Sequence, residues 1–247
     1  MKITTSETIL LYLAEISDLL NESTGNYLHK RHNILKLFEE KRKGSAVTTI
    51  QRLLLTSNIE KIVENGEVFY KITNQGKLKI NKKFRLNDIN RKWDKKWRIL
   101  IFDIPEKSRT ARNILRHKLS SLGFGLLQKS VWISPYDVVR EVSDFLKLHK
   151  LDKGVIFFEA NTIGEETNQQ IANTTWKLNE LNEKYDEILS DYTLNEDKNQ
   201  ASITFQNHYL SFLHEDPCLP QELYPNPWHG KEAQKLYFKL VKHNITN

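Results

Sequence analysis

The sequence of 247 residues contains one cysteine, Cys218, and nine glycines, and both shortages limit its chemistry. A single cysteine excludes an intramolecular disulfide framework and a zinc cluster built on cysteines, which suits a reducing cytoplasm. The eight histidines occur without an H-E-x-x-H pattern, which argues against a zinc site. A glycine-rich phosphate loop, a G-x-S-x-G elbow and a deaminase signature are also missing from the sequence.

Long apolar runs are missing too. The first twenty residues place polar and acidic side chains inside an apolar pattern, so they match neither a signal peptide nor a membrane span, and no other segment approaches the length of a span. We therefore expect a soluble, cytoplasmic protein that does not enter a membrane.

Positive charge is concentrated at the start of the chain. Residues 1–98 hold 20 Lys and Arg against 11 Asp and Glu, whereas residues 99–247 hold 17 against 20. This asymmetry predicts an N-terminal part that faces a polyanion, most simply nucleic acid, attached to a body with another task. The alternative is that the charge serves only solubility.

Three helices are predicted in the N-terminal part. The first begins at a capping box of Thr4 and Glu7, and its apolar face consists of Ile9, Leu13, Ile16 and Leu20. The second contains Leu28, Leu35 and Phe38 and is expected to break at Gly44. Ser45 is expected to cap the third, which buries Ala46, Ile50 and Leu53 and ends near Asn58, a residue type that tolerates the left-handed conformation.

A β-hairpin is predicted next, around Asn65-Gly66. Three helices followed by a hairpin indicate a winged helix-turn-helix, in which the third helix enters the major groove of double-stranded DNA. The DNA-binding side chains predicted on the third helix and the hairpin are Thr48, Thr49, Gln51, Arg52, Lys61 and Lys71. The alternative is a protein-docking module whose polar face is merely solvated.

The predicted fold class is α+β, with four consecutive segments. Residues 1–84 form the winged helix, 85–96 a basic linker in which Trp93 indicates packing, 97–165 a ferredoxin-like domain, and 166–247 a helical domain. The ferredoxin-like domain follows from the order strand (99–102), helix (107–121), two strands ("GLLQKS", "VWIS"), helix (137–149) and strand ("GVIFFEA").

Two stretches resemble a known family. The stretch "KWRILIFDIPEKSRTARNILRHKLSSLGFGLLQKSVWISPYD" is similar to the central domain of PaaX-family transcriptional regulators and, more remotely, to the small ferredoxin-fold nuclease subunit of CRISPR adaptation modules. The C-terminal stretch "DPCLPQELYPNPWHG" resembles a segment of the PaaX C-terminal domain that the CRISPR subunit does not have. The resemblance implies a transcriptional repressor that responds to an aryl-acyl-CoA effector.

Asp103 follows the predicted buried strand Ile99 to Phe102 and allows two interpretations. In the structural one, its carboxylate accepts backbone N–H bonds at the start of the next helix. In the catalytic one, two copies at a dimer interface share a Mg²⁺ ion and cleave a phosphodiester. One carboxylate per subunit is a weak metal site, so the structural interpretation is favoured.

Taken together, the residues and the resemblance predict a DNA-binding transcriptional regulator that acts as a repressor and a homodimer, without a catalytic residue or a cofactor. The dimer follows from the need of one winged helix for a second half-site contact. The alternative is an enzyme, a Mg²⁺-dependent endonuclease or CRISPR-adaptation subunit that uses Asp103. A third alternative is a scaffold whose sheet binds partner proteins.

Overall fold

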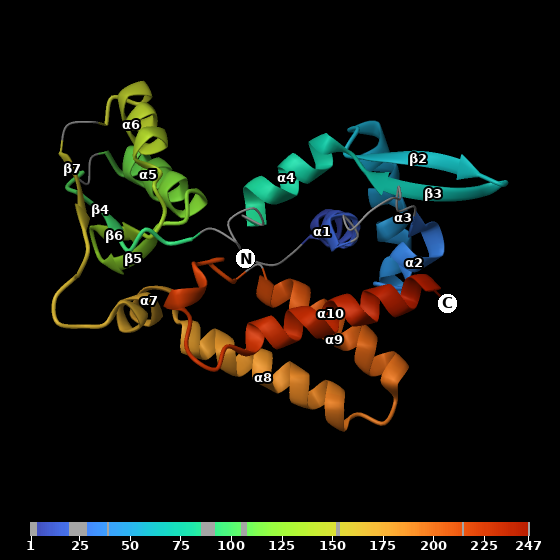
Figure 1. The fold of residues 1–247 in the computed structure, drawn as a ribbon. Helices are drawn as coiled ribbons and strands as arrows, with labels where there is room; N and C mark the ends of the chain where they lie inside the picture. Colours follow the sequence, from blue (N-terminus) through green and yellow to red (C-terminus); the bar gives the residue numbers. More distant parts are fainter. Residues whose placement is uncertain are drawn as a thin grey trace. The chain divides into compact units, whose positions relative to one another are not determined.

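The chain folds into two compact units of mixed helix and sheet (Figure 1). The computed structural model describes residues 4–19, 29–38, 40–84, 92–104, 108–151, 154–213 and 215–246. Unit 1 comprises residues 1–86, 181–216 and 227–247, and unit 2 comprises residues 87–180 and 217–226. The prediction divided the chain into four consecutive segments. The two units divide it in another way, because unit 1 combines N-terminal with C-terminal residues. The four segments therefore stay a prediction.

Unit 1 contains helices and a three-stranded sheet, and the helical C-terminal region supplies its last elements. These elements are α1 (Thr5–Leu19), β1 (His29–Lys30), α2 (Arg31–Leu35), α3 (Glu40–Leu55), β2 (Ile59–Glu64), β3 (Glu67–Ile72), α4 (Asn74–Phe84), most of α8 (Leu178–Leu194), α9 (Lys198–Leu213) and α10 (His229–Thr246). The strand order is β1-β3-β2, and both pairings are antiparallel.

Helix α1 begins as the sequence predicts. The backbone N–H of Thr4 donates to Glu7 Oε2 over 2.9 Å, and the N–H of Glu7 donates to Thr4 Oγ1 over 3.3 Å. This reciprocal pair satisfies two of the donors that a helix start leaves without an intrahelical partner. The predicted capping box is confirmed.

The predicted single apolar face of α1 is too narrow. Every residue from Ile9 to Ala14 is at most 1% exposed, so this part of the helix is buried all round. The cause is packing on several sides, because α1 contacts α3 and α4 as well as α10 (Figure 1). A helix that is enclosed in this way does not show the one-sided pattern of a surface helix. The side chains of Ile16 and Leu20 lie outside the described residues.

The boundaries of the third helix differ from the prediction at both ends. Gly44 does not end a helix, because α3 runs continuously through it from Glu40 to Leu55. At the other end Ser57, with φ of 51°, adopts the left-handed conformation that was expected of Asn58. Asn58 is instead 4% exposed, and its amide donates to Thr56 Oγ1 over 2.6 Å. A buried side-chain amide that caps the turn thus takes the following position.

The hairpin is confirmed, with a two-residue turn at Asn65-Gly66. Both residues have positive φ, 52° and 79°, as a tight hairpin turn of this kind requires. The six residues of β2 pair with all six of β3, from Ile59 opposite Ile72 to Glu64 opposite Glu67.

Helix α4 was not predicted and forms the end of the segment that was assigned to the winged helix, directly before the predicted linker. Thr73 holds its first turn, since Thr73 Oγ1 accepts from the N–H of Gly76 over 3.1 Å and donates to the carbonyl of Ser57 over 2.6 Å. Gly76 is required there, because an added Cβ would lie 2.1 Å from the carbonyl oxygen of Asn58. Residues 85–91 of the predicted linker lie outside the described residues.

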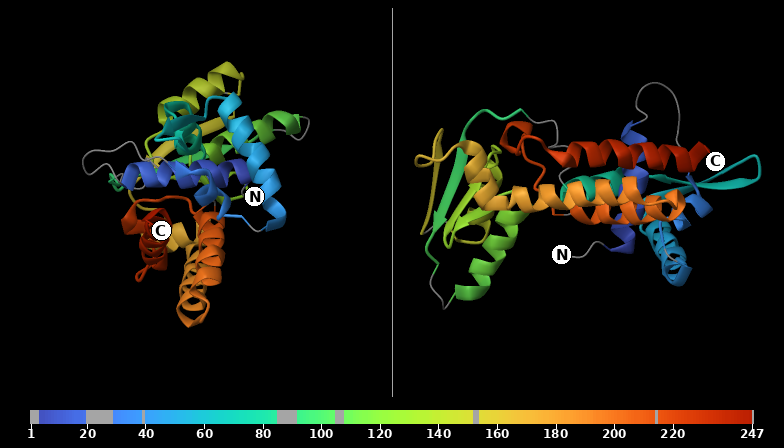
Figure 2. Two further views of the ribbon diagram at one scale, coloured as in Figure 1. Left: turned by 90° about the vertical axis from the view of Figure 1, so that its right-hand side faces the viewer. Right: turned by 90° about the horizontal axis from the view of Figure 1, so that it is seen from below.

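Unit 2 contains a four-stranded sheet with the order β5-β6-β4-β7, and all neighbouring strands are antiparallel. Its elements are β4 (Trp97–Phe102), α5 (Arg109–Ser121), β5 (Gly125–Gln128), β6 (Val131–Ser134), α6 (Val139–Leu148), β7 (Val155–Ala160), α7 (Asn168–Trp176) and a 3₁₀ turn η3 (Gln221–Leu223). Helices α5 and α6 lie together along one side of this sheet (Figures 1 and 2). None of the described helices is long and apolar enough to cross a membrane.

The two units have separate cores. The large cluster of unit 1 joins residues of α1, α3 and the hairpin to Tyr185, Tyr209 and Tyr237 of the C-terminal helices. The ring centroids of Tyr209 and Tyr237 lie 4.5 Å apart, where α9 runs beside α10 (Figure 2). The N-terminal helices therefore share one hydrophobic core with the end of the chain.

Candidate nucleic-acid interface

Helix α3 exposes three of the four residues predicted to contact DNA. Thr48, Gln51 and Arg52 are exposed, and among the described residues Arg52 has no ion-pair partner. Thr49 is 7% exposed, and its hydroxyl donates to the carbonyl of Ser45 over 2.8 Å. The prediction for Thr49 is therefore corrected: its side chain faces the core and its hydroxyl bonds to its own helix, because Ala46 and Leu53, three residues before it and four after it, are buried on the same face.

The two leucines at the end of α3 differ in their burial. Leu54 is half-buried against the core of unit 1, whereas Leu55 is 87% exposed. Leu55 lies seven residues after Thr48 and therefore on the same face of the helix. The exposed face thus combines polar side chains, which can bond base edges or phosphates, with one apolar side chain of the kind that contacts a thymine methyl group.

The hairpin is less basic than its lysines suggest. Lys61 is exposed, but Lys71 is half-buried and its Nζ lies 3.9 Å from Glu60 Oε1. Near the turn, Glu67 pairs over 2.5 Å with Lys30 of the neighbouring strand. Because carboxylates accompany these amines on the sheet, Lys61 is the better placed of the two lysines for a phosphate.

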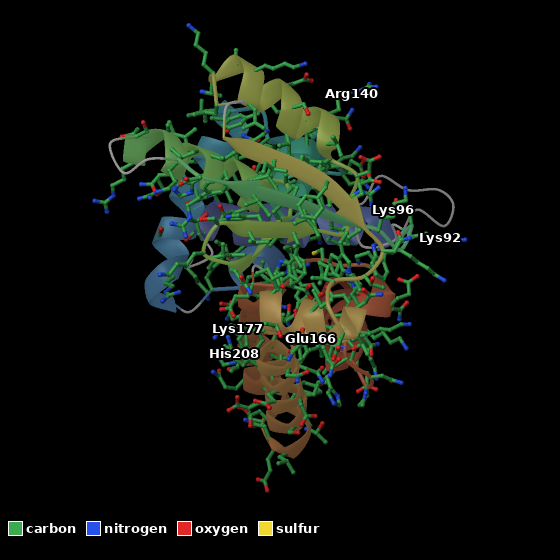
Figure 3. All side chains as sticks on the ribbon, turned by 90° about the vertical axis from the view of Figure 1, so that its left-hand side faces the viewer. Lys92, Lys96, Arg140, Glu166, Lys177 and His208 are labelled. Atoms are coloured by element: carbon green, nitrogen blue, oxygen red, sulfur yellow. The ribbon has the colours of Figure 1, made fainter. Side chains whose placement is uncertain are left out.

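The end of the predicted linker is tied to the sheet of unit 2. Arg98 is 3% exposed, and its guanidinium donates to both carboxylate oxygens of Asp94 over 2.7 and 2.6 Å. This hydrogen bond lowers the pKa of Asp94 and raises that of Arg98. Arg98 Nε also lies 3.3 Å from Glu159 Oε1, and Lys96, which is labelled in Figure 3, pairs with the same carboxylate. Part of the linker's positive charge is therefore neutralised within the protein.

The tryptophans of this segment pack as the sequence predicts. Trp97 is fully buried, lies edge-on to Trp93 at 5.3 Å and stacks on Trp176 at 6.2 Å. Its indole N–H donates to Asn168 Oδ1 over 2.7 Å. Residues 92–97 are thus part of unit 2 and do not form a free connector.

Asp103 is exposed at the end of β4. Its backbone N–H donates to the carbonyl of Gly154 over 3.0 Å, which extends the pairing of β4 with β7. Within the described residues its carboxylate accepts no backbone N–H, and Ser108 stands at the N-cap of α5. The same part of the chain contains no group of three His, Cys, Asp or Glu side chains that could hold a metal ion. The expected capping bonds of Asp103 are therefore not seen in the described residues.

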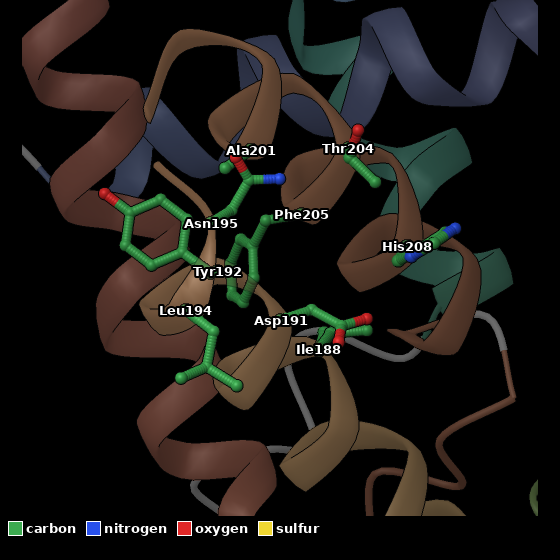
Figure 4. A pocket seen from close by; sticks show the side chains of 9 residues that line it. All are labelled: Ile188, Asp191, Tyr192, Leu194, Asn195, Ala201, Thr204, Phe205 and His208. Atoms are coloured by element: carbon green, nitrogen blue, oxygen red, sulfur yellow. The ribbon is translucent and has the colours of Figure 1, made fainter. Parts of the chain in front are cut away.

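A pocket of about 320 Å³ opens between α8 and α9 in unit 1 (Figure 4). Aromatic and aliphatic side chains, including Phe205, Tyr192 and Ile188, form much of its wall, while Asp191 and His208 supply the ionisable groups. Its size suits a small ring compound and not a whole nucleotide-bearing cofactor. Sequence reasoning missed this pocket, because its residues share no motif and meet only when two helices pack.

The stretch "DPCLPQELYPNPWHG", residues 216–230, leads into the start of α10. The side chain of Asn182 binds the backbone of this stretch twice. Its amide N–H donates to the carbonyl of Pro227 over 3.0 Å, and its oxygen accepts from the N–H of His229 over 2.7 Å. Gly230 is required because an added Cβ would lie 2.5 Å from Trp228 Nε1. The last residues of this stretch therefore fix the start of α10.

The comparisons with known proteins point to one family. Residues 90–172 match the family model described as the PaaX protein central Cas2-like domain, and residues 176–246 match the PaaX-like protein C-terminal domain. A curated relative, the transcriptional repressor PaaX of Escherichia coli (strain K12), is 25% identical over 166 residues, which are 61% of this chain and 52% of that protein. The match thus spans about half the length of this relative.

A solved structure shares the fold. The uncharacterized protein Rv0674 from Mycobacterium tuberculosis superposes with a TM-score of 0.58, is 19% identical, and the match covers 95% of this chain and 97% of that one. At this identity the likeness shows the α+β fold with its helical C-terminal region and nothing more.

Proposed function

We propose that this chain, which belongs to the PaaX family, is a cytoplasmic DNA-binding transcriptional regulator that acts as a repressor. The observation that carries the proposal is the exposed face of α3, which presents Thr48, Gln51 and Arg52. The hairpin of β2 and β3 follows this helix along the chain. We take residues 1–84 as a winged helix-turn-helix and residues 97–165 as a ferredoxin-like domain; the strand order β5-β6-β4-β7 supports the latter. The metal-dependent nuclease using Asp103 is not favoured.

In this mechanism α3 enters the major groove. Arg52 reads a base edge, with Thr48 and Gln51 beside it, and Lys61 of the hairpin contacts a phosphate. Base contacts carry sequence information, whereas phosphate contacts only position the protein. Each good base contact contributes about 1 to 3 kcal/mol of discrimination.

The experiment selects genomic fragments bound by the purified protein at a stated salt concentration and compares them with random duplexes. Arg52→Ala should lower the ratio of specific to random affinity by about tenfold or more, and Lys61→Ala should weaken both targets alike. Thr48→Ala should also lower this ratio, because Thr48 lies beside Arg52 in the proposed contact. Thr49→Ala is its matched control on the same helix, because Thr49 is buried, and it should leave the ratio unchanged. An unchanged ratio in Arg52→Ala would show that α3 does not read the operator.

The proposal includes a homodimer, because one winged helix contacts a single half-site. Two such modules spaced by a DNA turn or its multiple supply the affinity that specific regulators need. Sedimentation of the free protein and the symmetry of the selected operator test this part independently of the base contacts.

We further propose an aryl-acyl-CoA as the effector, with the pocket between α8 and α9 as a site for its aryl end. Phe205 lines the pocket and also belongs to the core that includes α1, so occupancy can reach the N-terminal helices within unit 1. Phenylacetyl-CoA should release the protein from its operator, and Thr204→Trp, which fills the pocket from an exposed position, should abolish that release. Release that persists in Thr204→Trp places the effector elsewhere.

A further inference from the structure

Within unit 2, helix α5 differs from the other helices in its charge. Its thirteen residues include three arginines, a lysine and a histidine and no acidic side chain. Helix α6 of the same unit mixes both signs, and α8 is mainly acidic. The basic character of α5 lies in the half of the sequence that is acidic overall, and the proposed function does not use it.

Two of the three arginines and the histidine lie on the exposed face of the helix. Leu115 and Leu119 are fully buried and fix the inner face of α5. The outer face exposes Arg109, Asn113, Arg116, His117 and Ser120 beside Ile114, which is 42% exposed. Apart from Ile114, each of these side chains can donate a hydrogen bond and none is negative, which is the composition of a surface that binds phosphates.

Contacts among the described residues leave two of these arginines without a carboxylate. The guanidinium of Arg116 lies 6.0 Å above the ring of Trp132, which orients it by a cation–π contact. Among the described residues neither Arg109 nor Arg116 has a carboxylate partner, whereas Lys177 of the same unit pairs with Glu180 over 3.1 Å. The two arginines therefore remain available to an external anion.

We propose that the outer face of α5 is a second DNA contact, which binds the phosphate backbone of double-stranded DNA. The proposal rests on the proposed function and extends it to unit 2. Arg109 and Arg116 are seven residues apart, or about 10 Å along the helix axis, a span of about three phosphates of one strand. One guanidinium group can donate two hydrogen bonds to the same phosphate. Each of the two arginines can therefore add affinity that does not depend on the DNA sequence.

The test measures duplex affinity against salt concentration for the wild type and for variants of α5 and α10. The double variant Arg109→Gln/Arg116→Gln should reduce the slope of log K against log salt by about two, because each lost phosphate contact removes about 0.9. The ratio of specific to random affinity should stay unchanged. The control, Lys231→Gln/Lys235→Gln, removes two exposed charges from α10 and should leave the slope as in the wild type.

Arg116→Lys separates charge from folding, since it keeps the charge and should largely retain the slope. A slope in the double variant equal to that of the wild type, with an unchanged melting temperature, would overturn the proposal. Coenzyme A supplies a second arm: if the double variant loses coenzyme A binding while its slope is unchanged, α5 binds a phosphorylated small molecule instead. Wild-type protein that binds no duplex would overturn the proposed function and this inference together.

Discussion

The two units of this protein are built from the sequence in different ways. The core of unit 1 joins residues 9–80 to residues 181–240, whereas the sheet and helices of unit 2 come from one continuous stretch, completed by residues 217–226. A core assembled from both ends of a chain forms only when the whole chain folds, because each part leaves apolar surface exposed without the other. The N-terminal helices that carry the proposed DNA contact therefore depend on the C-terminal helices, while unit 2 depends mainly on itself.

The strongest test of this difference is Tyr237→Ala in α10. Tyr237 is fully buried and stacks on Tyr209, so its truncation should cost about 3 to 5 kcal/mol of folding free energy. Hydrogen exchange should show loss of protection in α1 and α3, although the substitution lies in α10, and unchanged protection in β4. Protection that persists in α1 would show that the N-terminal part folds alone.

The matching test in unit 2 concerns the pair Asp94 and Arg98. The arginine lowers the pKa of Asp94 in the folded state, so the pair contributes stability above the ordinary carboxyl pKa and loses it as the pH falls through the lowered folded value. Acid titration followed by tryptophan fluorescence should show unit 2 losing stability in that acid range. Asp94→Asn should remove this step and leave the acid response of unit 1 as in the wild type; an unaltered step would assign it to other carboxylates.

A smaller effect is expected at the start of α1. Thr4→Ala removes the capping hydroxyl that accepts from Glu7 and should destabilise unit 1 by about 0.5 to 2 kcal/mol, with no change in unit 2. Chemical denaturation monitored separately for the two units checks this, and Thr4→Ser, which keeps the hydroxyl, is the control. A loss in Thr4→Ser as large as in Thr4→Ala would remove the cap from the explanation.

The last test compares two glycines of unit 1, and the smallest effect is expected at Gly44. Gly66 has φ of 79° in the hairpin turn, so Gly66→Ala should destabilise by about 1 to 2 kcal/mol. Gly44 lies inside α3 and an added Cβ meets nothing there, so Gly44→Ala should stabilise by about 0.5 to 1 kcal/mol. Thermal denaturation measures both; a loss of stability in Gly44→Ala would contradict the continuous helix.

Local patterns in the sequence determined several elements before any packing was known. The capping box at Thr4, the turn at Asn65-Gly66 and the buried strand before Asp103 were predictable, because each depends on residues that are neighbours in the chain. The family was also readable from two continuous stretches.

Tertiary structure alone decided the features that depend on distant residues. Thr49 and Thr48 are adjacent and chemically identical, yet only packing made one buried and the other exposed. Helix α1 is enclosed because α10, more than two hundred residues later, covers it, and the pocket around Phe205 exists because α8 meets α9. Burial is a property of the surroundings of a residue, and those surroundings come from parts of the chain that no local pattern connects.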